Sequence, residues 1–379
     1  MRILFVLEYY PPHIGGVESL FETIARGLVE RGHEVRVLTT QLSGYKRKET
    51  LDRVRVERIR IPFDSRGLFA IWALARTIPL ARWADVIHTS TFMAVPAASI
   101  AGMLTRTPVL ITGHERIGKR WFSLPRVSKL SAMALYLTEH ALYRFPAARI
   151  IAVSDATRRD IIAAGIRAEK VTRIYNAFDE RAWTDPSLAQ RTEALEKEHD
   201  LEDKTVFVVY GRPGVTKGIE YAVEAFERIR AYLSNAKLVL ITGRTPAAGY
   251  RDVSHVLDRI GREHVIERND LAFDELPAYV NLADVVIVPS LTEGFGYTTL
   301  ESATLHKRIV ASNVGAIPEV IFGRYRLIDP RDPEAIAHAC VAITKKPPEA
   351  SAPKRFPARS TIEAYEAEYT RIAGSPTDA

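Results

Sequence analysis

The stretch "LADVVIVPSLTEGFGYTTLES", residues 282–302, combines an apolar run with two glycines and two acids. The run "DVVIVP" is typical of a buried strand, because parallel strands covered on both faces carry continuous Val and Ile. Gly294 and Gly296 allow a sharp turn into a helix, whose first backbone amides would point toward a ligand. Glu293 and Glu301 flank this turn. A purely structural turn explains the glycines, and a hydroxyl-rich anionic ligand explains the glycines and the acids together.

The same strand-then-helix pattern continues along all 379 residues. Short runs of Val, Ile and Leu alternate with helical stretches, which predicts parallel sheets joined by crossover helices. The predicted strands are residues 2–7, 34–40, 55–61, 85–89, 108–112 and 149–154, then 205–210, 237–242, 264–267, 284–289, 308–312 and 325–328. Each half therefore has enough strands for a sheet of its own, and the predicted fold class is α/β.

A polar, charged segment separates the two halves. We place an N-terminal domain at residues 1–175, a linker at 176–203 and a C-terminal domain at 204–350. A proline-rich loop follows, and a final helix at about residues 358–375 ends near a glycine. Its apolar side chains recur at spacings of three and four, which predicts one buried face. These side chains are Ile362, Tyr365, Tyr369 and Ile372. We expect this helix to cross back and pack on the N-terminal domain.

Charge and cysteine content narrow the functional classes. Residues 1–178 carry 27 Lys and Arg against 15 Asp and Glu, whereas residues 179–379 carry 25 against 31. A basic half could face an anionic membrane or phosphorylated molecules, but no nucleic-acid-binding module is recognisable and none is expected. The single cysteine, Cys340, excludes an internal disulfide and fits a reducing compartment. The expected location is the cytoplasm, with peripheral contact at the cytoplasmic membrane face.

Two further loops have residues suited to an anionic ligand, and open parallel sheets bind ligands beyond the carboxyl ends of their strands. Gly15 and Gly16 stand at the start of a predicted helix, where they allow close approach of an anion, although a tight turn explains them equally well. Arg212 and Lys217 lie in a glycine-containing loop, and both could reach one diphosphate. Two solvated surface cations are the simpler explanation for such a pair taken alone.

Histidines give a weaker signal. His114 follows a strand and a glycine, so we expect it at the mouth of the N-terminal sheet. A lone histidine is more often structural than functional, and His88 is interpreted as structural. No cluster has the spacing of metal ligands, so neither a metal nor a cofactor is predicted.

Taken together, these motifs resemble the GT-B nucleotide-sugar glycosyltransferases, specifically the retaining glycosyltransferase family 4. The resemblance covers nearly the whole chain in the right order. It rests on "PPHIGGVESLFETIARGLVERGHEVRVLT", "GRPGVTKG", "EGFGYTTLE" and "RIVASNVGAIPEVI". It implies two Rossmann-like, doubly wound domains that face each other across a cleft. The first would be the acceptor side, and the second would bind the nucleotide sugar.

The resemblance also implies roles for the phosphate-binding residues. The backbone of Gly15 and Gly16 would approach the donor phosphates, and the backbone N–H of Gly16 would donate a hydrogen bond to them. Arg212 and Lys217 would neutralise the diphosphate as it leaves, so that no metal is required.

Further roles concern the sugar and the nucleoside. Glu293 would hold sugar hydroxyls near the reacting face, His114 would contact the sugar, and Glu301 would bind the ribose hydroxyls. The base would lie near Ile266–Arg268 and be read by backbone groups. The loop that holds sugar and phosphates comprises Gly294, Phe295, Gly296, Tyr297 and Thr298.

The implied reaction is transfer of a hexose from a nucleotide-diphosphate sugar with retained configuration. We favour attack on the same face, with the leaving phosphate taking the proton of the acceptor. Two alternatives stay open, a nucleotide-sugar epimerase on the same fold and a non-catalytic nucleotide-sugar-binding subunit. The sequence does not identify the donor sugar, the base or the acceptor.

One basic and aromatic stretch, residues 114–145, bears on the acceptor. Its cations surround Trp121 and Phe122, and an apolar helix follows, a combination suited to an interface between anionic headgroups and acyl chains. The cations are Arg116, Lys119, Arg120, Arg126 and Lys129. We expect a lipid-linked or membrane-proximal glycan acceptor; an internal loop, or a lid over a soluble sugar or small molecule, is the competing interpretation.

Overall fold

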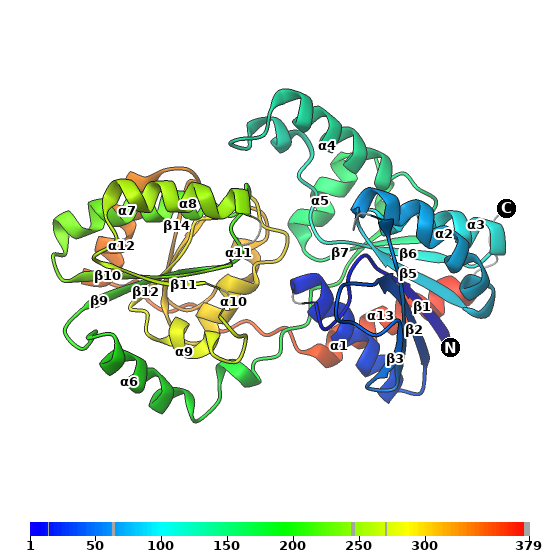
Figure 1. The fold of residues 1–379 in the computed structure, drawn as a ribbon, viewed down its shortest axis with the longest axis horizontal. Helices are drawn as coiled ribbons and strands as arrows, with labels where there is room; N and C mark the ends of the chain where they lie inside the picture. The colour runs from blue at the N-terminus through cyan, green and yellow to red at the C-terminus, as the bar shows by residue number, and fades with distance from the viewer. Residues whose placement is uncertain (14, 63–64, 244–246, 270, 375–379) are drawn as a thin grey trace. The chain divides into compact units, whose positions relative to one another are not determined.

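The computed structural model describes residues 1–13, 15–62, 65–243, 247–269 and 271–374. The chain divides into two compact units. Unit 1 comprises Met1–Phe122, Ser128–Phe178 and the chain from Phe356 onward, and unit 2 comprises Ser123–Val127 and Asp179–Arg355. The two sheets are labelled in Figure 1.

Unit 1 is built on a sheet in which the described residues form the order β3-β4-β2-β1-β5-β6-β7-β8. All neighbouring strands are parallel except β3, which runs antiparallel to β4. The strands are β1 (Arg2–Val6), β2 (Glu34–Thr40), β3 (Lys48–Leu51), β4 (Val54–Ile59), β5 (Val86–Ser90), β6 (Val109–Gly113), β7 (Arg149–Ala152) and β8 (Val171–Arg173). The carboxyl ends of the parallel strands therefore meet at one edge of the sheet.

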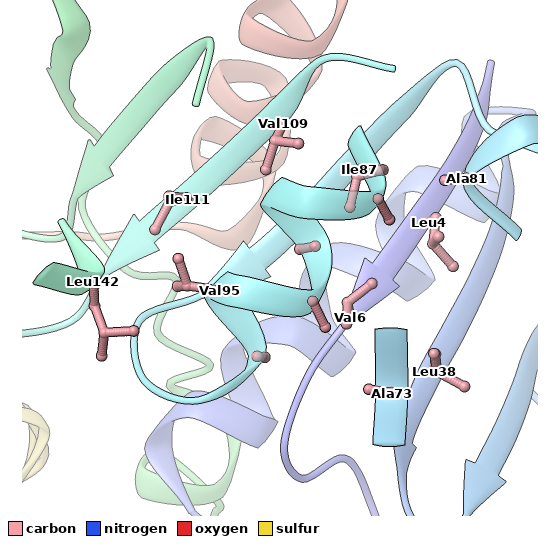
Figure 2. Packing of buried hydrophobic residues seen from close by; sticks show 14 of the residues in the cluster. Leu4, Val6, Leu38, Ala73, Ala81, Ile87, Val95, Val109, Ile111 and Leu142 are labelled. Atoms are coloured by element: carbon pink, nitrogen blue, oxygen red, sulfur yellow. The ribbon is translucent and has the colours of Figure 1, made fainter. Parts of the chain in front are cut away.

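Helices cover both faces of this sheet. On one face, α2 and α3 bury Val, Leu, Ile and Ala side chains against the strands, as the cluster around Leu4, Val95 and Ile111 in Figure 2 shows. On the other face, α1 and α13 pack against Phe5, Val37 and Leu110. The helices of unit 1 are α1 (Gly16–Glu30), α2 (Arg66–Trp83), α3 (Ala94–Thr105), α4 (Lys129–Leu142), α5 (Asp155–Ala163) and α13 (Ala358–Gly374).

The C-terminal helix α13 belongs to unit 1, as the sequence predicts. Tyr365 and Tyr369 are fully buried against β-strand residues of this unit. The Tyr369 hydroxyl lies 2.6 Å from Nδ1 of His88, and the Tyr365 hydroxyl lies 3.0 Å from Oγ1 of Thr112. Since Nε2 of His88 also lies 2.8 Å from Thr112 Oγ1, both ring nitrogens of this histidine are used inside the core.

Unit 2 has a parallel sheet in the order β11-β10-β9-β12-β13-β14 among the described residues. The strands are β9 (Thr205–Tyr210), β10 (Ala236–Thr242), β11 (Val265–Asn269), β12 (Val285–Val288), β13 (Arg308–Ser312) and β14 (Tyr325–Ile328). The helices are α6 (Leu188–Glu198), α7 (Ile219–Tyr232), α8 (Ala247–Ile260), α9 (Leu276–Asn281), α10 (Tyr297–Thr304), α11 (Ile317–Val320) and α12 (Pro333–Lys345). Helices α7, α8 and α12 share one apolar cluster with the strands. The predicted fold class, α/β with two parallel-sheet domains, is confirmed.

Some elements differ from the sequence prediction. The short strands β3 and β8 were not predicted, because "KETL" and "VTR" have almost no apolar pattern. The segment expected as a linker, residues 176–203, contains α6, which buries Leu188 and Thr192 at a spacing of four. Across the part of the chain that the structure describes, no helix combines the length and apolar character needed to cross a bilayer.

Candidate active site

The opening stretch forms the predicted strand–turn–helix junction. Strand β12 is completely buried, and α10 begins at Tyr297 after a loop of eight residues. Gly296 precedes the helix with φ of 98°, a left-handed conformation that side chains rarely adopt. A Cβ at this position would also lie 3.2 Å from Cγ2 of Val320. The glycine is therefore required by the turn itself, and the first amides of α10 stand at the carboxyl end of β12.

Glu293 and Lys217 form an ion pair at this end of the sheet. The Lys217 Nζ atom lies 2.7 Å from Oε2 of Glu293, and the Ser290 hydroxyl donates to the same oxygen at 3.2 Å. The backbone of Glu293 is held by the turn before α11, where Ala316 N donates to its carbonyl at 3.0 Å. Gly315 has φ of 51°, and a Cβ there would lie only 2.0 Å from the Glu293 carbonyl oxygen. The turn therefore fixes the acid through a backbone contact that only glycine allows.

The two loops that carry this pair lie directly beside each other. The backbone N of Leu291 donates to the Thr216 carbonyl at 2.7 Å. Gly218 is left-handed with φ of 59°, and a Cβ there would lie 2.3 Å from the Pro289 carbonyl oxygen. The loop after β9 and the loop after β12 are thus joined through their backbones. This contact holds Lys217 and Glu293 close to each other.

Glu301 is buried on α10, and the charges of both Lys217 and Glu293 act on its carboxyl. The Tyr210 hydroxyl donates to Glu301 Oε2 at 2.9 Å and lies 3.1 Å from the Ser302 hydroxyl. Burial raises the pKa of Glu301 to about 7; the repulsion of Glu293 adds to this, while the Tyr210 hydrogen bond and the charge of Lys217 oppose it. This carboxyl therefore titrates near neutral pH, whereas an exposed glutamic acid would be fully ionised there.

Two other predicted positions of unit 2, Arg212 and Ile266, stand on the loop after β9 and on β11. Arg212 follows Gly211, whose φ is 134°, and its side chain is exposed. Ile266 lies on β11, which pairs with β10 and forms the outer edge of the described sheet. Edge strands leave backbone groups of one side available. The Nε of Arg268 donates to the Tyr279 hydroxyl at 2.8 Å. Recognition of the nucleotide base by the backbone of this strand stays a prediction.

In unit 1, the predicted glycines stand at the start of α1. Gly15 precedes the helix in an extended conformation, and Gly16 is its exposed first residue. A Cβ on Gly15 would lie 2.2 Å from Oε2 of Glu18, which is buried in the first helical turn. His13 Nδ1 lies 3.0 Å from Oε1 of Glu18. The sequence analysis did not single out this acid or its histidine partner.

His114 follows β6 at the carboxyl end of the unit 1 sheet, as expected. Its backbone N donates to Oγ1 of Thr91 at 3.4 Å, and its ring lies 6.1 Å from the ring of Phe21. The Nε2 atom is buried and has no hydrogen-bond partner among the described residues. Burial lowers the pKa of His114 to about 4, so the imidazole is neutral at physiological pH. A buried ring nitrogen without a partner is an unusual feature that a bound hydroxyl would satisfy.

The structure thus brings together Lys217, Glu293 and Glu301, and it shows three supporting residues that the sequence analysis missed. Tyr210, Ser290 and Gly315 hold these acids in place through the contacts described above. Among the described residues, no group of three His, Cys, Asp or Glu side chains is arranged to hold a metal ion.

Both halves of the chain match models of known protein families. Residues 14–181 match the model of Glycosyltransferase Family 4, and residues 204–346 match Glycosyl transferases group 1. The protein is a GT-B glycosyltransferase of the group 1 family. The resemblance inferred from its motifs is therefore confirmed.

Individual group 1 relatives span most of this chain. An uncharacterised glycosyltransferase of Methanocaldococcus jannaschii is 28% identical over 363 residues, covering 89% of this chain and 87% of its own length. A GDP-mannose-dependent alpha-(1-6)-phosphatidylinositol monomannoside mannosyltransferase of Mycobacterium tuberculosis is 26% identical, covering 84% and 82%. The family and these relatives support the predicted enzyme class, a hexosyltransferase.

Solved structures agree on the fold. Anabaena HepE, crystallised with UDP and glucose, superposes with a TM-score of 0.75 at 22% identity and covers 98% of this chain and 100% of its own. WaaG, a glycosyltransferase involved in lipopolysaccharide biosynthesis, gives a TM-score of 0.71 at 14% identity and covers 99% and 100%. These likenesses confirm the GT-B fold.

Proposed function

We propose that this glycosyltransferase moves a hexose from a nucleotide-diphosphate sugar to a glycan, a small molecule or a lipid-linked acceptor, with retained configuration and without a metal. The observation that carries the proposal is the Lys217–Glu293 ion pair, 2.7 Å long, beside the glycine-capped start of α10. A cation, a carboxylate and the backbone amides of a helix start at one sheet edge suit a ligand that is anionic at one end and rich in hydroxyls at the other.

In the proposed reaction, the bond from the anomeric carbon to the diphosphate oxygen breaks and its electron pair stays on the diphosphate. Lys217 and Arg212 stabilise the negative charge that develops there, with help from the amides of Phe295–Thr298 and the backbone of Gly15 and Gly16. The acceptor hydroxyl attacks on the same face, and its proton moves to the leaving phosphate oxygen.

The sugar and the ribose are assigned to the acids. Glu293 accepts hydrogen bonds from sugar hydroxyls, and ionised Glu301 accepts them from the ribose. His114 hydrogen-bonds the donor sugar through Nε2 as a neutral imidazole, because its pKa of about 4 keeps it uncharged. The backbone near Ile266 reads the base.

The test is release of nucleotide diphosphate from a panel of nucleotide sugars, with and without candidate acceptors and in the presence of a chelator. We expect transfer that survives chelation and a product with the donor's anomeric configuration by NMR. Activity lost to the chelator and restored by a divalent cation would refute metal independence, and an inverted product would refute retention. Conversion of the donor to a stereoisomer without transfer would identify an epimerase.

We further propose a lipid-linked acceptor reached at an anionic membrane surface. The support is an exposed apolar stripe on α4, where side chains at spacings of three and four are left in solvent. The stripe consists of Leu130, Met133 and Leu137, which are 83%, 45% and 53% exposed. Exposed Lys119 and Lys129 lie before and at the start of this helix. Cations beside an apolar helical face favour an anionic bilayer surface.

The other expected cations have different partners. Arg116 is buried, Arg120 lies 2.5 Å from Asp160, and Arg126, a residue of unit 2, lies 2.8 Å from Asp252. Trp121 is half-buried. Phe122 and Lys119 of the same loop are exposed. The membrane proposal therefore rests chiefly on the α4 stripe, together with Lys119 and Lys129.

Vesicle flotation at low salt tests the stripe. We expect wild type to float with anionic vesicles and a Leu130→Ser/Met133→Ser/Leu137→Ser variant to remain at the bottom. A Met103→Ser/Leu104→Ser variant is the matched control, because these side chains are 62% and 65% exposed at the end of α3. Equal loss in both variants, or no flotation of wild type, contradicts the proposal and favours a soluble acceptor.

A further inference from the structure

A cavity of about 470 Å³ lies in unit 1 between α2 and the outer strands β2, β4 and β3. Its lining carries four cations and two carboxylates, a formal net charge of +2. The charged residues are Arg36, Lys48, Arg55 and Arg76, with Glu49 and Glu57. A volume of this size holds a small organic ligand.

Two of the arginines face each other across neighbouring strands. Arg36 of β2 and Arg55 of β4 are direct partners in the parallel register, so their side chains leave the same face of the sheet. Like charges placed opposite each other destabilise a sheet. A bound anion between them would reverse that effect.

The acids of the cavity are already engaged by other arginines. Glu57 accepts hydrogen bonds from Nε and Nη2 of Arg76 at 2.6 and 2.7 Å, and Glu49 pairs with Arg58. Burial opposes ionisation of Glu57, but its pKa is lowered by the hydrogen bonds and charge of Arg76 and by the charge of Lys48. Both carboxylates are therefore already paired with arginines, Glu57 with Arg76 and Glu49 with Arg58.

Arg36, Arg55 and Lys48 have no carboxylate partner within 4.0 Å among the described residues. The Arg36 guanidinium stacks over the Trp83 ring at 3.8 Å, while its buried Nε has no hydrogen-bond acceptor in the described chain. Burial, followed by repulsion from Arg55, lowers the pKa of Arg36. The stacked guanidinium is held in place with donor capacity to spare.

The cavity is remote from the candidate active-site residues of the same unit. Arg36 lies near the amino end of β2, and the strand continues about 13 Å to Thr40, at roughly 3.3 Å per residue. His114 and Gly15 follow the carboxyl ends of β6 and β1. The cavity therefore lies over the amino-terminal half of β2 and the middle of β4, away from the carboxyl ends of β6 and β1.

We propose that this cavity is a second anion site that binds a phosphate monoester, with Arg36 and Arg55 on the phosphate and Lys48 at its rim. A phosphate monoester carries about −1.5 to −2 charges near pH 7, which matches the net charge of the lining. Arginine forks suit its oxygens, and the volume accepts a phosphate attached to a sugar-sized group. The site is independent of the proposed donor-binding role of unit 2.

Isothermal titration of the full chain with glucose 6-phosphate and with inorganic phosphate tests the site. We expect Arg36→Gln/Arg55→Gln to weaken binding at least about tenfold, because hydrogen bonds to charged groups are lost. Arg60→Gln replaces an exposed cation that directly follows β4 and does not line the cavity, so this variant should bind like wild type. Lys217→Ala should also retain this binding, since it removes a cation of the donor loop only.

Each outcome decides the proposal. Binding that disappears in Lys217→Ala and persists in the double arginine variant would assign the phosphate to the donor loop and overturn it. Glucose is the uncharged probe, and equal binding of glucose overturns it too. Vesicles containing phosphatidic acid distinguish the source: capture by vesicles but not glucose 6-phosphate, lost in the double variant, identifies a lipid headgroup. Absence of binding to all phosphate probes refutes the site. Arg55 is exposed, so the single variant Arg55→Gln should fold normally and still show weakened binding if the double variant fails to fold.

Discussion

The carboxyl ends of the two sheets hold their candidate residues in opposite ways. In unit 2, Lys217, Glu293 and Glu301 each have a protein partner within 3 Å. In unit 1, the Nε2 atom of His114 is buried with no hydrogen-bond partner in the described chain. Charged groups must be paired to be buried, whereas a neutral imidazole tolerates an unused nitrogen at a smaller cost. The comparison therefore contrasts a paired cluster of charged groups in unit 2 with a neutral hydrogen-bonding group in unit 1.

The largest expected effect concerns the ion pair of unit 2. Lys217→Ala and Glu293→Gln should each lower turnover of the donor about 10²- to 10³-fold, because transition-state charge loses its stabilisation. Folding stability should change by no more than about 2 kcal/mol for Lys217→Ala, since the lysine side chain is one-third exposed and the Ser290 hydroxyl still donates to the largely buried Glu293 carboxylate. Steady-state release of nucleotide diphosphate and thermal melting measure the two quantities. Lys346→Ala, an exposed cation of unit 2, is the control, and near-wild-type turnover in either test variant removes that residue from the site.

A second prediction breaks the backbone support of the same acid. Gly315→Ala would put a Cβ 2.0 Å from the Glu293 carbonyl oxygen, so the loop must shift. We expect a loss of roughly 3 kcal/mol in the free energy of unfolding together with about a hundredfold loss of turnover. Gly323→Ala is the matched control, because Gly323 is also left-handed with φ of 79° but has no atom within 4 Å of the added Cβ. It should lose about 1 kcal/mol and keep its activity. Similar behaviour of both variants contradicts the proposed support.

A third prediction separates the two histidines of unit 1. His114→Leu should lower turnover about tenfold without lowering the melting temperature, because Nε2 of His114 makes no hydrogen bond that could be lost. His88→Leu should do the reverse, since it leaves the buried Tyr369 hydroxyl without its His88 partner and removes one of the two contacts of the Thr112 hydroxyl. Thermal melting and donor turnover of the two variants give the comparison. A destabilised His114→Leu variant with normal turnover would make His114 a structural residue.

The smallest effect is a pH dependence of donor binding. Glu301 has its pKa raised to about 7 by burial, so its carboxylate form, which accepts ribose hydroxyls, grows as pH rises through 7. We expect the donor Kd to fall several-fold between pH 6 and 8, on the order of what one ionisation allows, and Glu301→Gln to bind more weakly with a flat profile. Between pH 4.5 and 7 the folded state binds more protons at Glu301 than the unfolded state, so this group lowers stability as pH rises. His114, with a pKa of about 4, should not contribute between pH 6 and 8. A wild-type Kd that is independent of pH contradicts the assignment of Glu301.

The sequence is most informative where structure depends on neighbours along the chain. The apolar run before Glu293 predicts a buried strand, and the glycines after it predict a tight turn; both are present in the structure. Tyr210 could not be found in this way, because a tyrosine at the end of "TVFVVY" looks like an ordinary core residue. Its contact with Glu301 joins residues 91 positions apart.

Other features depend on tertiary register. The requirement for Gly315 comes from the carbonyl of Glu293, which only the folded chain brings within reach. Likewise, the facing of Arg36 and Arg55 follows from the pairing of β2 with β4 and is invisible in a list of cations. Helix α6 was missed because its buried positions, Leu188 and Thr192, stand in a strongly charged segment.

The central claim is that unit 2 grips a nucleotide-diphosphate sugar through Lys217 and Glu293. The most direct test is thermal melting of wild type and Lys217→Ala against a panel of nucleotide diphosphates and their sugars, because a ligand specific for the folded state raises its melting temperature. We predict that at least one nucleotide sugar raises the melting temperature of wild type and that Lys217→Ala loses most of this shift. If no nucleotide sugar stabilises wild type, or if the shift is the same in Lys217→Ala, the claim is contradicted.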